Sequence, residues 1–177
     1  MPMRLLASLL DTEYSLEYID HIRDIARGVV LNEQNEVAII KLHGRDAFGD
    51  RNYYELPGGG VKKDEDFSSA FKREMEEETG FSVEIIAEIG QVNDFYNKIH
   101  RENHQYYYLG KTIKYVGKHL EEYEKSMMEK VIFIPLLDAI ELFKNMQDYG
   151  CGKLVKNREL PVLIEAKNIL DQMKIKY

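Results

Sequence analysis

The sequence GGGVKKDEDFSSAFKREMEEETGF, which occupies residues 58–81, joins a run of glycines to a strongly acidic segment. Glycine lets the backbone adopt positive φ angles and approach a ligand closely, so the first residues predict a loop. The segment that follows has helical spacing and ends at Gly80, a residue that favours helix C-termini. We interpret the stretch as a metal-binding helix entered through a phosphate-binding loop.

Three glutamates of this predicted helix, Glu74, Glu77 and Glu78, are spaced i, i+3 and i+4 and share one helical face. Carboxylates at this spacing repel one another, and hard oxygen ligands suit Mg²⁺ or Mn²⁺. The alternative is a solvated acidic surface without a metal. A helical wheel favours the metal site, because Glu74 and Glu78 lie near the apolar face, where a carboxylate needs a partner. That apolar face consists of Phe67, Ala70, Phe71 and Met75.

The spacing of these residues resembles a complete Nudix box. The matching positions are Gly59, Glu65, Arg73, Glu74, Glu77, Glu78 and Gly80, with apolar Met75 and Phe81 at two further positions. The resemblance implies an α/β fold, a Nudix-type α/β/α sandwich around a mixed sheet, in a single domain. It also implies membership of the Nudix (MutT-like) hydrolase family.

This resemblance implies Mg²⁺-dependent hydrolysis, with Mn²⁺ as a possible substitute, of the pyrophosphate linkage in a nucleoside diphosphate derivative. Such substrates include nucleoside triphosphates, dinucleoside polyphosphates, ADP-ribose and sugar nucleotides. Glu77 would be a metal ligand or the base that activates the attacking water, whereas Arg73 and Glu65 would hold the loop–helix geometry. The implied metal ligands are Glu74, Glu77, Glu78 and the carbonyl of Gly59.

Two questions stay open at this point. Many Nudix enzymes take a base or an extra ligand from a late loop, which in this chain contains several glutamates that are also candidates for ordinary surface charges. The second question is whether the protein is an enzyme. The alternative is a non-catalytic Nudix-fold sensor of a nucleotide or sugar nucleotide, although such modules usually lose carboxylates of the box. The late-loop candidates are Glu121, Glu122, Glu124 and Glu129.

Candidate substrate contacts lie outside the box. Arg45 and Arg51 are candidates for phosphate binding, and Tyr54 and Tyr96 for stacking on a base. Each has a structural alternative, because loop arginines are often solvated and strand tyrosines often belong to the core. Further aromatic and basic candidates are Tyr53, Phe95, His100, Arg101, His104, Tyr106, Tyr107 and Tyr108.

Composition restricts the class of protein. A chain of 177 residues with 44% hydrophobic and 31% charged residues predicts one soluble globular domain. The net charge of −7 argues against non-specific binding to nucleic acid or an anionic membrane. A single cysteine, Cys151, excludes an internal disulfide and predicts a buried, unreactive thiol. The apolar run at residues 5–10 is too short for a signal peptide or membrane span, so we expect a cytoplasmic protein.

The order of elements predicts one domain with an N-terminal addition. Residues 1–22 are expected to form an extension, helical or irregular, that packs on the domain or on a partner chain, and residues 23–177 the Nudix domain. The amphipathic ends of the chain raise the possibility of a homodimer. The turn at residues 32–35 predicts a hairpin between strands at 23–31 and 36–42.

The remaining elements are predicted from periodicity and from proline and glycine. A helix is expected from Pro135, and a second one at residues 161–174 after a break at residues 149–152. Loops are expected at residues 43–52 and 118–128, and strands at 53–56, 81–92, 104–116 and 131–134.

Overall fold

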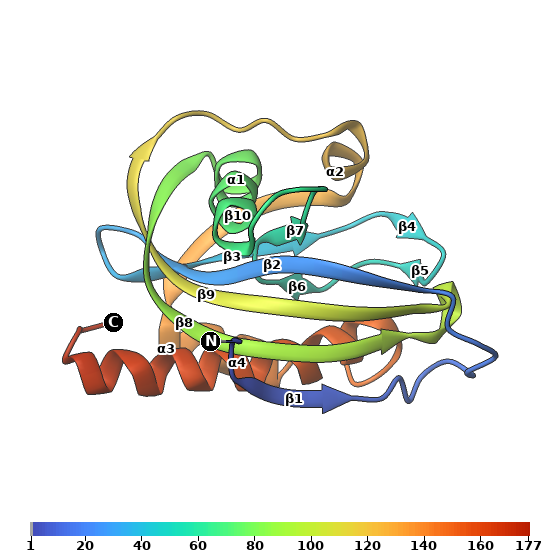
Figure 1. Cartoon of the computed structure of the whole chain (residues 1–177). Helices are drawn as coiled ribbons and strands as arrows, with labels where there is room; N and C mark the ends of the chain where they lie inside the picture. Colours follow the sequence, from blue (N-terminus) through green and yellow to red (C-terminus); the bar gives the residue numbers. More distant parts are fainter. Residues whose placement is uncertain (1) are drawn as a thin grey trace.

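A computed structural model describes residues 2–177 and shows three layers (Figure 1). A mixed sheet forms the middle layer, with α1 (Phe67–Thr79) and α2 (Glu122–Met127) over one face and α3 (Leu136–Lys144) and α4 (Gly150–Met173) over the other. This arrangement confirms the predicted α/β/α sandwich in a single domain. Among the described residues, no helix is both long and apolar enough to cross a bilayer.

The sheet has the strand order β1-β8-β9-β2-β3-β10. Strands β1 and β8 run parallel, as do β2 and β9, whereas β8 and β9 form a long antiparallel hairpin. The bounds are β1 (Leu5–Leu9), β8 (Phe81–Tyr96), β9 (Arg101–Tyr115), β2 (His21–Leu31), β3 (Glu36–Leu42) and β10 (Met128–Pro135). A 3₁₀ turn at Asn97–Ile99 joins β8 to β9.

The predicted hairpin between β2 and β3 is confirmed, with Leu31 opposite Val37 at its closed end. Beyond this end two short strands take over the pairing: β6 (Tyr54–Glu55) pairs with β3, and β7 (Gly58–Gly60) pairs with β2. The prediction of a loop at the glycines is therefore wrong. Their backbone groups are held in a sheet ladder, which fixes the approach to α1.

The N-terminal segment corrects a second expectation. Leu5–Leu9 is neither helical nor irregular, but forms β1 and pairs in parallel with β8, with Leu5 opposite Gln91. Sheet pairing with an available neighbour here overrides the weak helical spacing of the leucines. The extension is thus the outermost strand of the same sheet (Figure 1).

Three further boundaries differ from the predictions. Helix α4 begins at Gly150, so the expected break at residues 149–152 and the expected start at Pro161 are both wrong. Pro161 removes one backbone donor from the helix interior, but the buried residues on either side keep the helix continuous. The expected loop at 118–128 contains α2, and the loop at 43–52 contains the small hairpin of β4 (Arg45–Asp46) and β5 (Gly49–Asp50).

Two hydrophobic clusters hold the layers together. The larger cluster fills the space between the sheet and the α3–α4 layer, and the smaller one joins α1 to the opposite face. In the smaller cluster Phe71 and Met75 are fully buried against Ala26 and Val30 of β2. This contact orients α1 and thereby decides where its glutamates point.

Candidate active site

Helix α1 begins and ends where the sequence predicts. Asp66 caps its N-terminus by accepting a hydrogen bond from the backbone N–H of Ser69 (2.9 Å), and Gly80 ends it with a φ of 82°. Between these ends Glu74 and Glu78 are only 5% and 6% exposed. The prediction that both glutamates lie at the apolar face is therefore confirmed, and glutamates are rarely so buried without a partner.

A third carboxylate joins these two from a distant part of the chain. Carboxylate oxygens of Glu74, Glu78 and Glu124 all lie within 4.8 Å of one another. We call these three residues the acid cluster. Carboxylates this close repel one another strongly where water is excluded. Three hard oxygen donors in one place are the ligands that Mg²⁺ or Mn²⁺ prefers, so the residues present fit a divalent cation.

The raised pKa values of Glu74 and Glu78 also favour a divalent cation at this place. Burial raises the pKa of Glu78 well above its ordinary value, although the charge of Arg27 and a hydrogen bond from the Gly58 N–H (2.7 Å) oppose the shift. Burial also raises the pKa of Glu74 against the opposing contact with Arg73. The nearby arginines therefore do not offset the full cost of burying both carboxylates in their ionised form. A divalent cation would supply the remaining positive charge.

Arg73 connects the acid cluster to the segment before the helix. Its guanidinium donates to both carboxylate oxygens of Glu65 (2.8 and 2.9 Å), to the Gly60 carbonyl (3.0 Å) and to Glu74 (2.6 Å). The Arg73 contact lowers the pKa of Glu65 to about 2. This geometry agrees with a positioning role for Arg73 and Glu65; a direct part in catalysis stays a prediction.

Glu77 and Gly59 lie beside the acid cluster in different ways. Glu77 is half-buried, accepts a hydrogen bond from Arg73 (2.9 Å) and lies outside the 4.8 Å grouping that Glu124 completes. A Cβ atom at Gly59 would lie 2.5 Å from Oε2 of Glu74. Gly59 therefore has to lack a side chain for the Glu74 carboxylate to occupy its position. Metal ligation by Glu77 and Gly59 stays a prediction.

A cavity of about 430 Å³ opens next to the acid cluster, and residues of α2, β2 and β7 form part of its wall. Glu78, Glu121 and Glu124 contribute acidic groups to its wall, and Arg51 and Tyr96 also line it. Further lining residues are Arg23, Arg27, Asp46, Tyr53, Glu55, Gly58, Gly59, Gly60, Arg101, Tyr123 and Cys151. A concave site of this size, with charged groups of both signs, can hold a nucleotide-sized ligand.

The four predicted substrate contacts separate into two groups. Arg51 and Tyr96 line the cavity, Arg51 with its Nε donating to Asp46 (2.7 Å) and Tyr96 with its hydroxyl accepting from a buried arginine. Arg45 and Tyr54 do not line it. Arg45 is exposed and pairs with Asp50 (3.2 Å), and the ring of Tyr54 packs beneath the Lys41 ammonium (4.5 Å to the ring centroid).

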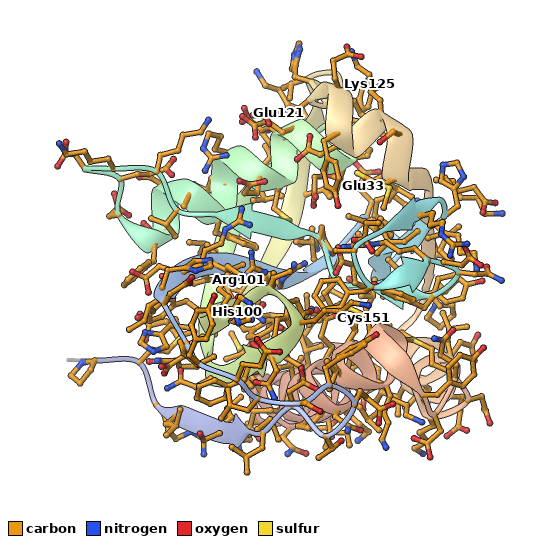
Figure 2. All side chains as sticks on the ribbon, turned by 90° about the vertical axis from the view of Figure 1, so that its right-hand side faces the viewer. Glu33, His100, Arg101, Glu121, Lys125 and Cys151 are labelled. Carbon is orange, nitrogen blue, oxygen red and sulfur yellow. The ribbon has the colours of Figure 1, made fainter. Side chains whose placement is uncertain are left out.

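The late glutamates are separated just as clearly. Glu124 belongs to the acid cluster, and its Oε2 accepts from the Glu121 N–H (2.7 Å) in a capping box that starts α2. Figure 2 shows Glu121 just before α2 and Lys125 on this helix. Glu122 is exposed and pairs with Lys125 (2.8 Å), and Glu129 is exposed beside Lys130. Of the four late-loop candidates, the structure brings only Glu124 into the acid cluster.

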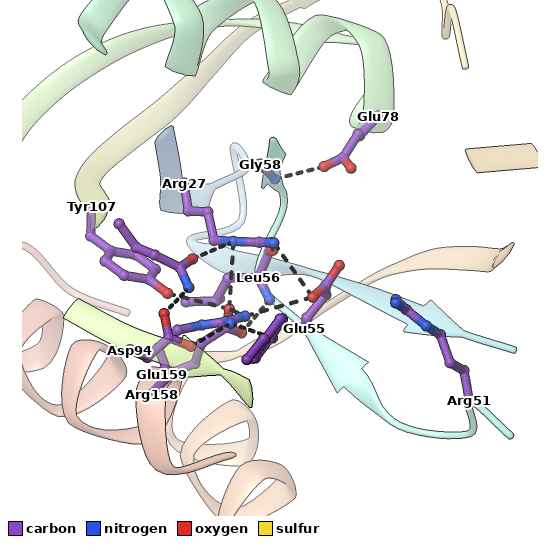
Figure 3. Close-up of polar contacts among 12 residues, drawn as sticks. Arg27, Arg51, Glu55, Leu56, Gly58, Glu78, Asp94, Tyr107, Arg158 and Glu159 are labelled. Carbon is purple, nitrogen blue, oxygen red and sulfur yellow. Dashed lines mark hydrogen bonds and ion pairs between the residues drawn. The ribbon is translucent and has the colours of Figure 1, made fainter. Parts of the chain in front are cut away.

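A second set of buried charges, not predicted from the sequence, lies beside the cavity (Figure 3). We call it the ion network; its members are Arg27, Glu55, Asp94, Arg158 and Glu159. Glu159 Oε2 accepts from the Leu56 N–H (2.6 Å), and Arg27 Nη1 donates to the Leu56 carbonyl (2.8 Å). The ion network thus holds the chain immediately before Gly58, whose N–H donates to Glu78.

One sequence signal could have found part of the ion network. Glu159 lies four residues after Val155 and four before Leu163, both fully buried, so a helix continued through Pro161 places it on the core face. The expected helix start at Pro161 concealed this spacing. The buried thiol of Cys151 is confirmed, and burial raises its pKa, which makes it a poor nucleophile.

Comparison with known proteins places this architecture in a family. The NUDIX domain profile matches residues 21–150, which include the glycine strand, α1 and α2. A curated relative, the RNA pyrophosphohydrolase of Pelagibacter ubique (strain HTCC1062), is 43% identical over 61 residues. That match covers 34% of this chain and 36% of the relative.

Solved structures agree at the level of the fold. The MutT protein of Methanosarcina mazei Go1 superposes with a TM-score of 0.61 at 17% identity, covering 88% of this chain and 98% of that one. A NUDIX hydrolase of Nitrosomonas europaea gives a TM-score of 0.60 at 14% identity, covering 88% and 93%. Together with the profile match over most of the chain, these findings establish that the protein belongs to the Nudix hydrolase family.

Proposed function

We propose that this protein is a divalent-metal-dependent pyrophosphohydrolase that cleaves the pyrophosphate linkage of a nucleotide substrate. The observation that carries the proposal is the acid cluster at the wall of a nucleotide-sized cavity. Candidate substrates are nucleoside triphosphates, dinucleoside polyphosphates, ADP-ribose and sugar nucleotides. The name of the Pelagibacter relative adds RNA to these candidates.

Glu74, Glu78 and Glu124 would hold Mg²⁺ or Mn²⁺ in this proposal. When bound, the ion neutralises negative charge on the phosphates and favours attack on phosphorus. Arg73 keeps Glu74 oriented through its 2.6 Å contact, and the Gly58 N–H does the same for Glu78. These contacts fix two carboxylates before the substrate arrives, which reduces the reorganisation needed during the reaction.

Glu124 is the proposed base that accepts a proton from the attacking water. It is half-buried, lines the cavity and is carried by α2, whereas the carboxylate of Glu77 is occupied by Arg73 and lies 3.8 Å from the Lys62 ammonium. A base has to reach the proton that it removes, and the position of Glu124 supports this better than that of Glu77. Glu77 is the alternative base.

The test is turnover of a substrate panel by the purified protein, with Mg²⁺ or with EDTA. The panel contains the four candidate classes of small-molecule substrate and an RNA with a 5′-triphosphate. Glu78→Gln removes a ligand of the acid cluster, and Glu76→Gln, an exposed residue of the same helix, is the matched control. We expect Mg²⁺-dependent turnover that the first substitution abolishes and the control preserves.

Two results would contradict the proposal. Turnover that persists in EDTA or in Glu78→Gln would remove the acid cluster from the mechanism. Nucleotide binding without turnover of any panel member would support the sensor interpretation instead. Comparing Glu124→Gln with Glu77→Gln at saturating Mg²⁺ then identifies the base, because excess metal offsets weaker metal binding whereas loss of the base still lowers kcat.

A further inference from the structure

Two arginines of the cavity wall, Arg23 on β2 and Arg101 on β9, have no acidic partner in the part of the chain that the structure describes. The other two arginines of the wall, Arg27 and Arg51, each pair with a carboxylate. Within residues 2–177, neither Arg23 nor Arg101 has a carboxylate oxygen within 4.0 Å of its guanidinium nitrogens. Their positive charge is therefore available to a ligand in the cavity.

The register of the sheet brings these two arginines together. Strands β2 and β9 are parallel, with Arg23 opposite Asn103 and therefore one step along the same face from Arg101. Figure 2 looks onto the end of the sheet where Arg101 lies. The charge of Arg23 and, to a larger extent, burial lower the pKa of Arg101. Two like charges thus lie close to each other, with Arg101 half-buried and Arg23 exposed.

The acidic residues nearest in sequence do not neutralise this pair. Asp24 and Glu102 each follow one of the arginines, so strand alternation directs them to the opposite face of the sheet. There both contact His104, at 3.6 Å for Asp24 and 2.9 Å for Glu102. At this end of the sheet, neither Asp24 nor Glu102 therefore neutralises the two arginines.

Polar atoms that are buried and unpaired lie near the start of β9. The Nε of Arg101 is buried and has no hydrogen-bond partner, and neither polar atom of the Asn103 amide has one although Asn103 is fully buried. The ring of Tyr96 lies 5.4 Å from the Arg101 guanidinium and supports it from one side. Buried polar groups are normally satisfied, so the unpaired Nε of Arg101, which lines the cavity, points to a missing anionic ligand.

Strand β7 lies between Arg23 and Glu74, and the cavity joins the two arginines to the rest of the acid cluster. A Cβ atom at Gly60 would lie 2.7 Å from Nη2 of Arg23, and one at Gly59 would lie 2.5 Å from Oε2 of Glu74. Adjacent strand residues point to opposite faces, so Arg23 and Glu74 lie on the two sides of β7. Glu78 and Glu124, the other two members of the acid cluster, line the same cavity as Arg23 and Arg101. A short phosphate chain can extend from a metal at the acid cluster to the two arginines.

We propose that Arg23 and Arg101 bind a phosphate beyond the pair held at the metal, so that the preferred substrate carries at least three consecutive phosphates. This inference rests on the proposed function and narrows its substrate class. It selects nucleoside triphosphates, dinucleoside polyphosphates and 5′-triphosphate ends over ADP-ribose and sugar nucleotides, which have only two phosphates. Arginine suits this task because its planar donors match phosphate oxygens.

The first test measures anion binding without turnover. Isothermal titration calorimetry of the metal-free protein in EDTA would use tripolyphosphate as the ligand, with Arg23→Gln, Arg101→Gln and the exposed control Arg45→Gln. Each cavity substitution should weaken binding about tenfold or more, as expected for loss of a charge-assisted hydrogen bond, and the control should not. Equal affinities in all four proteins, or no binding by the unsubstituted protein, would overturn the phosphate site.

The second test uses kinetics with substrates of different phosphate number. Arg23→Gln and Arg101→Gln should raise KM about tenfold for a triphosphate-bearing substrate, with a smaller change in kcat. Faster turnover of ADP-ribose than of any longer phosphate chain by the unsubstituted protein would overturn the assignment of substrate class. Absence of all turnover would refute the proposed function alone, since calorimetry tests the arginine site independently.

Discussion

Two buried groups of charges lie on opposite sides of the cavity and differ in how the charges are arranged. In the ion network, every carboxylate has an arginine close by: Arg158 lies 2.7 Å from Glu159 and 3.4 Å from Asp94. In the acid cluster, the carboxylates face one another instead. Within residues 2–177, no lysine or arginine nitrogen comes within 4.0 Å of Glu78 or Glu124.

The difference teaches that burial alone does not identify a site. Both groups are desolvated, and both contain pKa values shifted by burial. The ion network meets this cost with its own arginines and backbone donors, so it stabilises one arrangement of the chain. In the acid cluster, Arg73 and single backbone donors offset only part of this cost, and a divalent cation would offset the rest.

Removing one carboxylate from the acid cluster should produce the largest effect on activity. Glu78→Gln keeps the size and the buried position but withdraws a charged ligand, so kcat/KM should fall by about 10³-fold, equivalent to about 4 kcal/mol of lost stabilisation of the transition state. Steady-state kinetics with the best panel substrate measures this loss. An activity within threefold of the unsubstituted protein would contradict it.

Breaking the ion network should instead affect stability. Arg158→Met leaves Glu159 and Asp94 buried without their shared partner, and unfolding in urea should show a loss of about 3–5 kcal/mol. The control is Lys167→Met on the same helix, which removes only an exposed pair with Asp171. A stability change no larger than that of the control would show that the network is not a structural group.

A methyl group placed between the glycine strand and the acid cluster should have an intermediate effect. In Gly59→Ala the new Cβ would displace the flexible end of Glu74, which lies 2.5 Å from that position. A shift of about 1 Å in a catalytic group can lower activity about 10²-fold while the fold remains intact. Kinetics and thermal unfolding of the same preparation separate the two effects; retained activity would place Glu74 outside the reaction.

The smallest expected effect of the acid cluster is a pH-dependent change in the stability of the folded protein. The pKa of Glu78 is raised in the folded state, so its contribution to the stability of the metal-free protein is present below about pH 4.5, the unfolded value, and is lost as the pH rises through the raised pKa. Glu78→Gln cannot ionise. In EDTA its Tm should therefore exceed that of the unsubstituted protein by an amount that grows from pH 5 to pH 8.

Each pKa unit of that shift corresponds to about 1.4 kcal/mol, and 1 kcal/mol moves the Tm of a chain of this size by about 2–4 °C. Differential scanning calorimetry resolves such a change. Saturating Mg²⁺ should reverse the order of the two Tm values at pH 8, because only the unsubstituted protein has the full acid cluster. A Tm difference independent of pH would mean that ionisation of Glu78 does not destabilise the folded protein.

The parts of this molecule that depend on local pattern were predictable from the sequence. The cap at Asp66, the end at Gly80 and the inward direction of Glu74 and Glu78 all follow from spacing within one helix. The hairpin of β2 and β3 follows from its polar turn in the same way.

The parts that depend on distant contacts were not predictable. Glu124 was one of four similar candidates until α2 and the cavity placed it beside α1, and Arg23 had no distinguishing neighbour in the sequence. The glycines were expected in a loop because their strand exists only through pairing with β2. Burial of Arg158 likewise depends on the helix that continues through Pro161. Partners far apart along the chain decide each of these cases.

The central claim is that the acid cluster binds a divalent cation, and a direct titration tests it. Mn²⁺ binding can be followed by electron paramagnetic resonance for the unsubstituted protein, Glu78→Gln and the control Glu76→Gln. The account predicts binding by the first and the control, with at least tenfold weaker binding by Glu78→Gln. Equal Mn²⁺ affinity in all three proteins would contradict it.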